Sequence, residues 1–167
     1  MRRRRRDHRR DTRHQCLKKR KNNRIMSYTF LDELTYADIA FEAQADTLEE
    51  LFISAALATT ESMVALDSVE KKVEKNFSVT ESTEEALLFS FLEELVIFKD
   101  SEQLFLTAFK IRIEQKDGKY HCKVSAKGDT INTETQELHN DVKAVTMHHF
   151  TLEHSAEGWK ATVILDV

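Results

Sequence analysis

The sequence predicts an α+β domain of two layers, in which two helices pack on a mostly antiparallel β-sheet. Two stretches begin with a capping-box pattern and continue with apolar residues at helical spacing. Most of the other segments alternate between apolar and polar residues, as half-buried strands do. An Asp-Gly pair between two alternating segments indicates an antiparallel hairpin.

The first part of the domain is expected to contain two strands and a helix. Residues 28–31 are predicted to form a short strand, and residues 39–44 alternate as a half-buried strand does. Thr47 opens the first capping box, and the apolar stripe behind it predicts a helix from Leu48 to Val64. This stripe is typical of a helix that packs on a core.

A long strand and the most apolar helix are expected next. Apolar residues occupy odd positions over residues 69–79, together with Lys71 and Lys75. Lysines on that face indicate a strand that is partly covered or lies at a sheet edge. The second capping box begins at Ser82-Thr83, and the apolar stripe behind it predicts a core helix over residues 84–98.

The second half of the chain is expected to consist of strands. The Asp117-Gly118 pair predicts a hairpin between the first two of them. Residues 155–158 are predicted to form a turn between the last two, and the weakly patterned residues 128–141 a polar loop. The four predicted strands cover residues 109–114, 120–126, 144–154 and 159–167.

Charge divides the chain into two physically different parts. Residues 1–26 hold thirteen basic and two acidic residues, whereas residues 27–167 hold twelve basic and twenty-seven acidic residues. The basic arm has too few apolar residues to bury, so we expect it to be disordered. The arm could contact phosphates, act as a nuclear address, or be translated leader sequence ahead of Met26-Ser27. The acidic domain should repel bare nucleic acid.

Several classes of function are disfavoured by the sequence. Cys16 and Cys122 lack metal-ligand spacing, which indicates a reducing, cytoplasmic compartment without a disulfide. No apolar run reaches the roughly 18 residues of a membrane span. The three glycines form no phosphate-binding loop, and no nucleophile motif is present. His148 and His149 are adjacent on a predicted strand, so they are expected to face opposite ways and not to share a metal.

Carboxylates are the remaining candidates for chemistry. Asp38 begins an otherwise apolar strand, and Asp166 interrupts the last apolar run just before Val167. Asp38 could simply face solvent, or it could bind a cation or a partner. If the last strand lies beside the strand that Asp38 begins, these two side chains and the carboxylate of Val167 would meet at one rim. Crowded carboxylates repel one another, and a hard cation with oxygen ligands would relieve that repulsion.

From Ser27 onward the sequence resembles the archease family. Five segments carry the resemblance in the family's order, and together they span the acidic domain. They are Ala37-Asp38-Ile39, Asp46-Thr47-Leu48-Glu49-Glu50-Leu51-Phe52 with residues 55–58, Leu87 to Leu95, residues 142–146 with His148, and Gly158-Trp159-Lys160 with the terminal Asp166-Val167.

The resemblance implies a non-catalytic protein that activates the RtcB-type RNA ligase of tRNA splicing. Archeases promote guanylylation of that ligase and so allow multiple turnover. The implied partner is the ligase, with tRNA reached only through it and no membrane involved. The family's metal site falls on Asp38, Asp166 and Val167, for a divalent cation, calcium before magnesium or manganese.

The chain departs from the family pattern around the first aspartate. The family motif His-Thr-Ala-Asp-Ile-Gly is replaced by residues 35–40, Thr-Tyr-Ala-Asp-Ile-Ala, and Met147 stands where an aromatic residue is common. Two other functions stay open on sequence grounds. One is a general chaperone or interaction module without a metal role. The other is a metal-dependent hydrolase, which is the weaker alternative because no general base or nucleophile accompanies the carboxylates.

Overall fold

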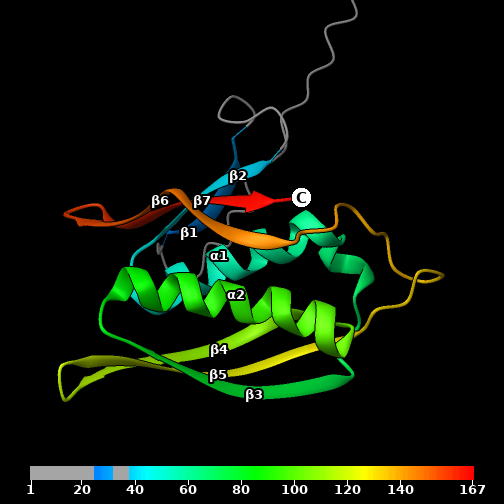
Figure 1. Cartoon of the computed structure of the whole chain (residues 1–167), viewed down its shortest axis with the longest axis horizontal. Helices are drawn as coiled ribbons and strands as arrows, with labels where there is room; N and C mark the ends of the chain where they lie inside the picture. The colour runs from blue at the N-terminus through cyan, green and yellow to red at the C-terminus, as the bar shows by residue number, and fades with distance from the viewer. Residues whose placement is uncertain (1–24, 32–37) are drawn as a thin grey trace, which may run out of the picture.

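The computed structural model describes residues 25–31 and 38–167. The basic arm up to residue 24 and the substituted motif positions 35–37 lie outside the described residues. Two helices and two antiparallel sheets make up the described part of the chain, so the α+β class is confirmed. The helices lie between the sheets, and the two-layer arrangement expected from sequence is thereby extended by a second sheet (Figure 1).

The first sheet contains the two ends of the domain. Its strand order is β1 (Met26–Phe30), β2 (Ile39–Ala45), β7 (Gly158–Asp166) and β6 (Ala144–Ser155). The second sheet has the order β3 (Val73–Glu81), β5 (Lys119–Thr130) and β4 (Leu104–Lys116). β3 is therefore an edge strand. The lysines on its apolar face had predicted a strand that is either partly covered or at a sheet edge, and the second of these is observed.

Both predicted capping boxes begin a helix. The hydroxyl of Thr47 accepts a hydrogen bond from the main-chain N–H of Glu50 at 3.2 Å, and helix α1 runs over Leu48–Met63. Thr83 accepts from the N–H of Ala86 at 3.1 Å at the start of helix α2 (Glu84–Glu102). These hydroxyls satisfy main-chain donors that the first helical turn leaves without intrahelical partners.

The core lies where the helices face both sheets. The ring of Phe91 on α2 stacks on Phe52 of α1, with centroids 5.3 Å apart, and on Phe77 of β3, with centroids 6.1 Å apart. Its edge contact with Phe109 of β4 completes the cluster. Leu92, next to Phe91, is fully buried. The prediction that this helix is the core helix is confirmed.

Four predicted boundaries were wrong by four residues or more. The strand expected to end at residue 126 runs to Thr130, so residues 128–130 belong to β5 and not to the predicted loop. The strand expected from Val69 begins at Val73, and a short 3-10 helix, η1, precedes it at residues 66–68. The strand expected from residue 109 begins at Leu104, and its pairing with β5 shifts between Leu106 and Ala108. Helix α2 continues four residues past Phe98 and ends at Glu102, and the capping residue Gln103 adopts a left-handed conformation.

The predicted hairpin and turn are present. Asp117 and Gly118 both have positive φ, as the two-residue turn between β4 and β5 requires. Gly158 opens β7 with φ of 105°, and a Cβ there would lie 2.5 Å from the main-chain oxygen of Ala45. Both the backbone conformation and this close approach favour glycine.

The expected arrangement of His148 and His149 was wrong. Strand β6 is irregular between Thr146 and Thr151, and His149 has φ of 53°. A bulge changes the direction of side chains, so the alternation of a regular strand does not hold there. The two imidazole rings lie with their centroids 4.1 Å apart, and both side chains are exposed.

In the described part of the chain, no helix has the length and apolar character needed to cross a bilayer.

Candidate functional site

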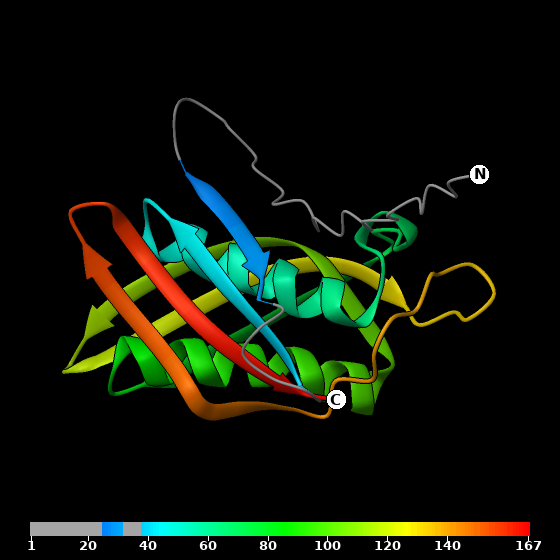
Figure 2. The same ribbon diagram turned by 90° about the horizontal axis from the view of Figure 1, so that it is seen from above.

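The last strand lies beside the strand that Asp38 precedes. β2 and β7 pair antiparallel, with Ile39 opposite Leu165. Continuing this register by one residue places Asp38 opposite Asp166. Figure 2 shows the end of β7 beside the start of β2. The adjacency on which the predicted carboxylate site depended is thus present.

The two aspartates belong to the outer face of the first sheet. Leu165 is fully buried on the face toward the helices, and strand alternation directs Asp166 to the other face. Asp38 and Asp166 are both exposed. Residues opposite one another in an antiparallel pair project to the same face, so the two carboxylates share one side of the sheet.

Val167 completes this region, which we call the acidic corner: Asp38, Asp166 and Val167. The side chain of Val167 packs against the hydrophobic core and is partly buried. Its packing holds the last residue of the chain at the end of β7, directly after Asp166. The structure therefore brings the three predicted residues to one edge of the first sheet.

A main-chain hydrogen bond supports the acidic corner from the β6 side. The N–H of Lys143 donates to the main-chain oxygen of Asp166 at 2.8 Å, and Ala144 pairs with Asp166 as β6 begins. Asp166 is therefore held on one side by β6, while β2 lies on the other. Its backbone is fixed although its side chain is exposed.

Sequence reasoning missed the residue that anchors this support. Lys99, near the end of α2, is 7% exposed, and its ammonium group contacts the main-chain oxygen of Val142 at 2.8 Å. The same group binds carboxylate oxygens of Asp141 at 2.5 Å and Asp100 at 2.7 Å. Lys99 continues the buried row of α2 one turn beyond Leu95, and that spacing is a signal that could have revealed it.

Burial and ion pairing act in opposite directions on Lys99. Burial lowers the pKa of its ammonium group, but the hydrogen bonds with Asp100 and Asp141 outweigh burial and leave the pKa raised. The hydrogen bond from Lys99 lowers the pKa of Asp141 below its usual value. Both groups are therefore charged at neutral pH, and the segment before β6 stays tied to α2.

The donor set of the acidic corner suits a hard divalent cation. Its groups are carboxylates, and Ca²⁺, Mg²⁺ and Mn²⁺ all accept such oxygen ligands. Like charges directly opposite each other on a sheet are destabilising, so a cation would relieve repulsion between Asp38 and Asp166. Among the described residues, no group of three or more His, Cys, Asp or Glu side chains could hold a metal ion. The corner has two such side chains, and its third carboxylate belongs to the main chain.

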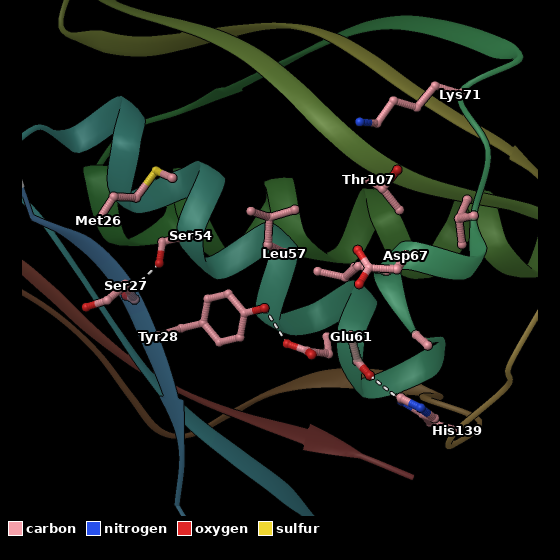
Figure 3. Close-up of a pocket in the computed structure, with 13 residues that line it drawn as sticks. Met26, Ser27, Tyr28, Ser54, Leu57, Glu61, Asp67, Lys71, Thr107 and His139 are labelled. Carbon is pink, nitrogen blue, oxygen red and sulfur yellow. Dashed lines mark hydrogen bonds between the residues drawn. The ribbon is translucent and has the colours of Figure 1, made fainter. Parts of the chain in front are cut away.

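A cavity of about 440 Å³ lies elsewhere, between β1, α1, and η1 with its neighbouring residues (Figure 3). Inside it the hydroxyl of Tyr28 donates to the carboxylate of Glu61, and a ring nitrogen of His139 lies 2.7 Å from the main-chain oxygen of Glu61. Asp38 and Asp166 are not among its lining residues. The cavity therefore does not extend the acidic corner.

The geometry defines a small α+β protein with two helices held between sheets and an acidic corner where the last strand meets the second. Residues 28–167 match the archease protein family (MTH1598/TM1083). The chain belongs to this family, and the resemblance found in the sequence is confirmed.

Curated relatives agree with this assignment. The chain is similar to protein archease of Pyrococcus furiosus, with 42% identity over 132 residues that cover 78% of this chain and 93% of the relative. It is 32% identical to protein archease of Methanosarcina mazei over 141 residues, which cover 84% and 95% of the two chains. Neither name specifies a reaction.

Two solved structures share the fold. The solution structure of protein 1598 of Methanobacterium thermoautotrophicum superposes with a TM-score of 0.74 and 36% identity, over 84% of this chain and 98% of the other. The crystal structure of an archease and possible chaperone from Thermotoga maritima gives a TM-score of 0.54 at 21% identity, over 80% and 93%. The latter shows the fold alone.

The structure accommodates two of the departures from the family pattern. Ala40 lies within β2 opposite Ile164 and is buried, so a side chain fits where the family has glycine. Met147 lies in the irregular part of β6 and is 58% exposed. An aromatic side chain is therefore not needed there to fill the core.

Proposed function

We propose that this chain is a cation-binding protein cofactor that activates an RtcB-type RNA ligase, promoting its guanylylation and multiple turnover in tRNA splicing. The observation that carries the proposal is the placement of Asp38 opposite Asp166, beside Val167, in a chain that belongs to the archease family. The protein itself catalyses no step in this proposal.

The three groups of the acidic corner would act as oxygen ligands. Ca²⁺ is the preferred cation, because it tolerates a variable number of carboxylate oxygens in flexible geometry, whereas Mg²⁺ requires near-ideal octahedral coordination. The bound cation would supply positive charge at a surface that otherwise presents adjacent carboxylates. Lys99 and Lys143 would act as positioning residues, because they fix the backbone of Asp166 through the start of β6.

The ligase is expected to meet this protein through complementary charge. An RNA-binding enzyme carries a basic surface, and the acidic domain would be steered toward it. Under this proposal the activation takes place in the cytoplasm, and tRNA reaches the protein through the ligase.

A ligation assay tests this function. The ligase would be given GTP and an excess of RNA with a 2′,3′-cyclic phosphate or 3′-phosphate end and a 5′-hydroxyl end. We expect product beyond one equivalent of ligase only when this protein is present, and faster formation of guanylylated ligase before RNA is added. Equal product with and without the protein would show that it does not activate the ligase.

A general chaperone is the second candidate. The Thermotoga maritima relative is described as a possible chaperone. Four large apolar side chains of the described residues are exposed: Ile25 (52%), Ile97 (50%), Leu138 (43%) and Met147 (58%). Such side chains could contact unfolded proteins. Suppression of the aggregation of an unrelated heated protein, retained in an Asp38→Ala variant, would favour this function over ligase activation.

A further inference from the structure

The outward face of the second sheet is basic, although the domain as a whole is acidic. The helices cover one side of this sheet (Figure 1). Strand alternation directs every second side chain to the other side, away from the helices. Register pairs align the outward positions in rows across β3, β5 and β4. The basic residues on this face, all exposed, are Lys110, Arg112, Lys116, Lys119, Lys123 and Lys127.

Basic residues are far more frequent on this face than in the domain as a whole. The face, which we call the basic face, holds six of the twelve basic residues found in 27–167, and three acidic residues, Glu74, Glu114 and Asp129 at the end of β5. Twenty-four of the twenty-seven acidic residues of that region therefore lie elsewhere. Opposite charges are segregated onto different surfaces, so the net charge alone does not describe how this protein meets a partner.

The other groups on the basic face are those that bind phosphate oxygens. Asn76, Ser78 and Ser125 line a shallow depression together with Lys110 and Lys123. Lysine, serine and asparagine side chains commonly contact the nucleic-acid backbone, where they position a strand without reading its sequence. Arg112 is paired with Glu114 at 2.7 Å, which leaves the lysines as the main cations.

The spacing of these groups is regular. Same-face residues recur along a strand about every 6.8 Å, and neighbouring strands lie about 4.8 Å apart. Lys119, Lys123 and Lys127 occupy every second outward position along β5, about 13.6 Å apart, and Lys110 lies on the neighbouring β4. A row of this kind suits a polymer with regularly spaced anionic groups. Among its outward positions the only aromatic side chain is the imidazole of His121, whose Nδ1 lies 2.9 Å from the hydroxyl of Thr80.

We propose that the basic face binds the phosphate backbone of RNA without sequence specificity. The choice of RNA over DNA rests on the proposed role beside an RNA ligase, whereas the binding of a polyanion rests on the face itself. The contact is local. At about 0.1 M salt the Debye length is roughly 10 Å, so the basic face acts on a phosphate strand while distant acidic groups are screened. The acidic domain as a whole still disfavours RNA that approaches any other surface.

Lysine footprinting on the full chain tests this contact. Acylation of each lysine would be measured by mass spectrometry, with and without a structured RNA, at about 0.1 M salt. We expect several-fold lower acylation of Lys110, Lys119, Lys123 and Lys127 when RNA is present. Acylation should not change at Lys160 on β7 or at Lys143 just before β6. Because each lysine is read separately, binding by the basic arm does not mask the result.

Matched charge reversals provide a second measurement. The Lys110→Glu/Lys123→Glu variant should bind RNA about tenfold more weakly, because it removes phosphate contacts, with a smaller dependence of affinity on salt. The Lys143→Glu/Lys160→Glu variant changes the net charge equally and should lose at most about twofold. The Lys110→Glu/Lys123→Glu variant should still promote ligase guanylylation before RNA is added, which separates failure of this inference from failure of the proposed function.

Three outcomes would overturn the inference. Equal loss of RNA affinity in both double variants would mean that only net charge matters. Protection of the basic face at high protein concentration without RNA would assign it to contact with an acidic surface of a second copy. Protection by polyglutamate as strong as that by RNA would assign it to acidic proteins.

Discussion

The ammonium group of Lys99 donates a hydrogen bond to the main-chain oxygen of Val142 at 2.8 Å, near the point where β6 begins. The next residue, Lys143, donates its N–H to the main-chain oxygen of Asp166. The end of α2 is thereby connected through two hydrogen bonds to the acidic corner. A buried lysine on the core helix thus positions a carboxylate that lies on the opposite face of the first sheet.

Replacing Lys99 with methionine should loosen this connection. Methionine retains an apolar stem but leaves the buried oxygen of Val142 without its donor, which costs about 1–3 kcal/mol. Urea unfolding would measure the loss. Lys110→Met, on an exposed lysine of β4, is the control and should change the free energy of unfolding by less than about 0.5 kcal/mol. Equal stability of the two variants would show that Lys99 does not anchor β6.

Local signals in the sequence were sufficient for the helices and one hairpin. Thr47 and Thr83 each precede an apolar stripe, and a side-chain cap with a periodic stripe is a pattern that few alternative structures satisfy. Asp117 and Gly118 similarly meet the positive φ values of a tight turn.

The division of the strands between two sheets could not be predicted from the sequence, because alternation identifies a strand but not the strands that pair with it. β2 pairs with β7 across more than a hundred residues of sequence, and this pairing alone places Asp38 beside Asp166. Lys99 was missed for a related reason. A lysine near a helix end is usually exposed, and only the approach of Val142 and Asp141 from a distant segment makes its burial possible.

Truncation of Leu92 should be severely destabilising. Its side chain is fully buried on α2, so Leu92→Ala removes apolar contacts and leaves a cavity, at a cost of about 2–5 kcal/mol. Ile97 on the same helix is 50% exposed and provides the control. Ile97→Ala should cost less than about 1 kcal/mol in the same denaturation experiment. Similar costs for the two variants would mean that the buried face of α2 is wrongly assigned.

The thiol of Cys122 should be unreactive in the folded protein. Burial, with a smaller contribution from Glu49, raises the pKa of Cys122 to about 12, so the thiol is neutral at pH 8. In a Cys16→Ser background, a thiol reagent at pH 8 should react rapidly only after unfolding in urea. Because this pKa is raised in the folded state, stability should fall as pH rises from about 9, the ordinary thiol value, toward 12. Rapid reaction of the native protein would contradict the burial of Cys122.

The first 24 residues should be dispensable for folding. Ile25 bonds to Asp46 through its main-chain N–H at 2.9 Å and through its main-chain oxygen at 3.1 Å, and β1 begins at Met26. A chain that begins at Ile25 keeps these contacts, although its new amino-terminal group carries a charge. Its melting temperature should match that of the full chain within a few degrees. A large decrease would show that the arm contributes to the stability of the domain.

The sharpest test of the proposed function is the pair of variants Asp38→Ala and Asp166→Ala. Each removes one exposed carboxylate from the acidic corner, so each should stay folded, with a change in stability within about 0.5 kcal/mol. Relief of repulsion between opposed carboxylates should appear as a slight gain in the free energy of unfolding within that range. Asp67→Ala, on an exposed aspartate of η1, is the control.

Thermal melts with and without Ca²⁺ should separate the variants from the control. A cation at one hundred times its Kd stabilises the folded state by about 2.7 kcal/mol, and this gain should vanish in Asp38→Ala and Asp166→Ala but persist in Asp67→Ala. Guanylylation of the ligase with GTP would be measured in the presence of each of the same proteins. We expect it to be lost with Asp38→Ala and Asp166→Ala and retained with Asp67→Ala.

Three outcomes for Asp38→Ala would contradict this prediction. If Asp38→Ala unfolds, the residue is structural. If it folds and activates normally, the site is elsewhere. If it loses the response to Ca²⁺ yet still activates, the function belongs to a protein interface and not to the metal.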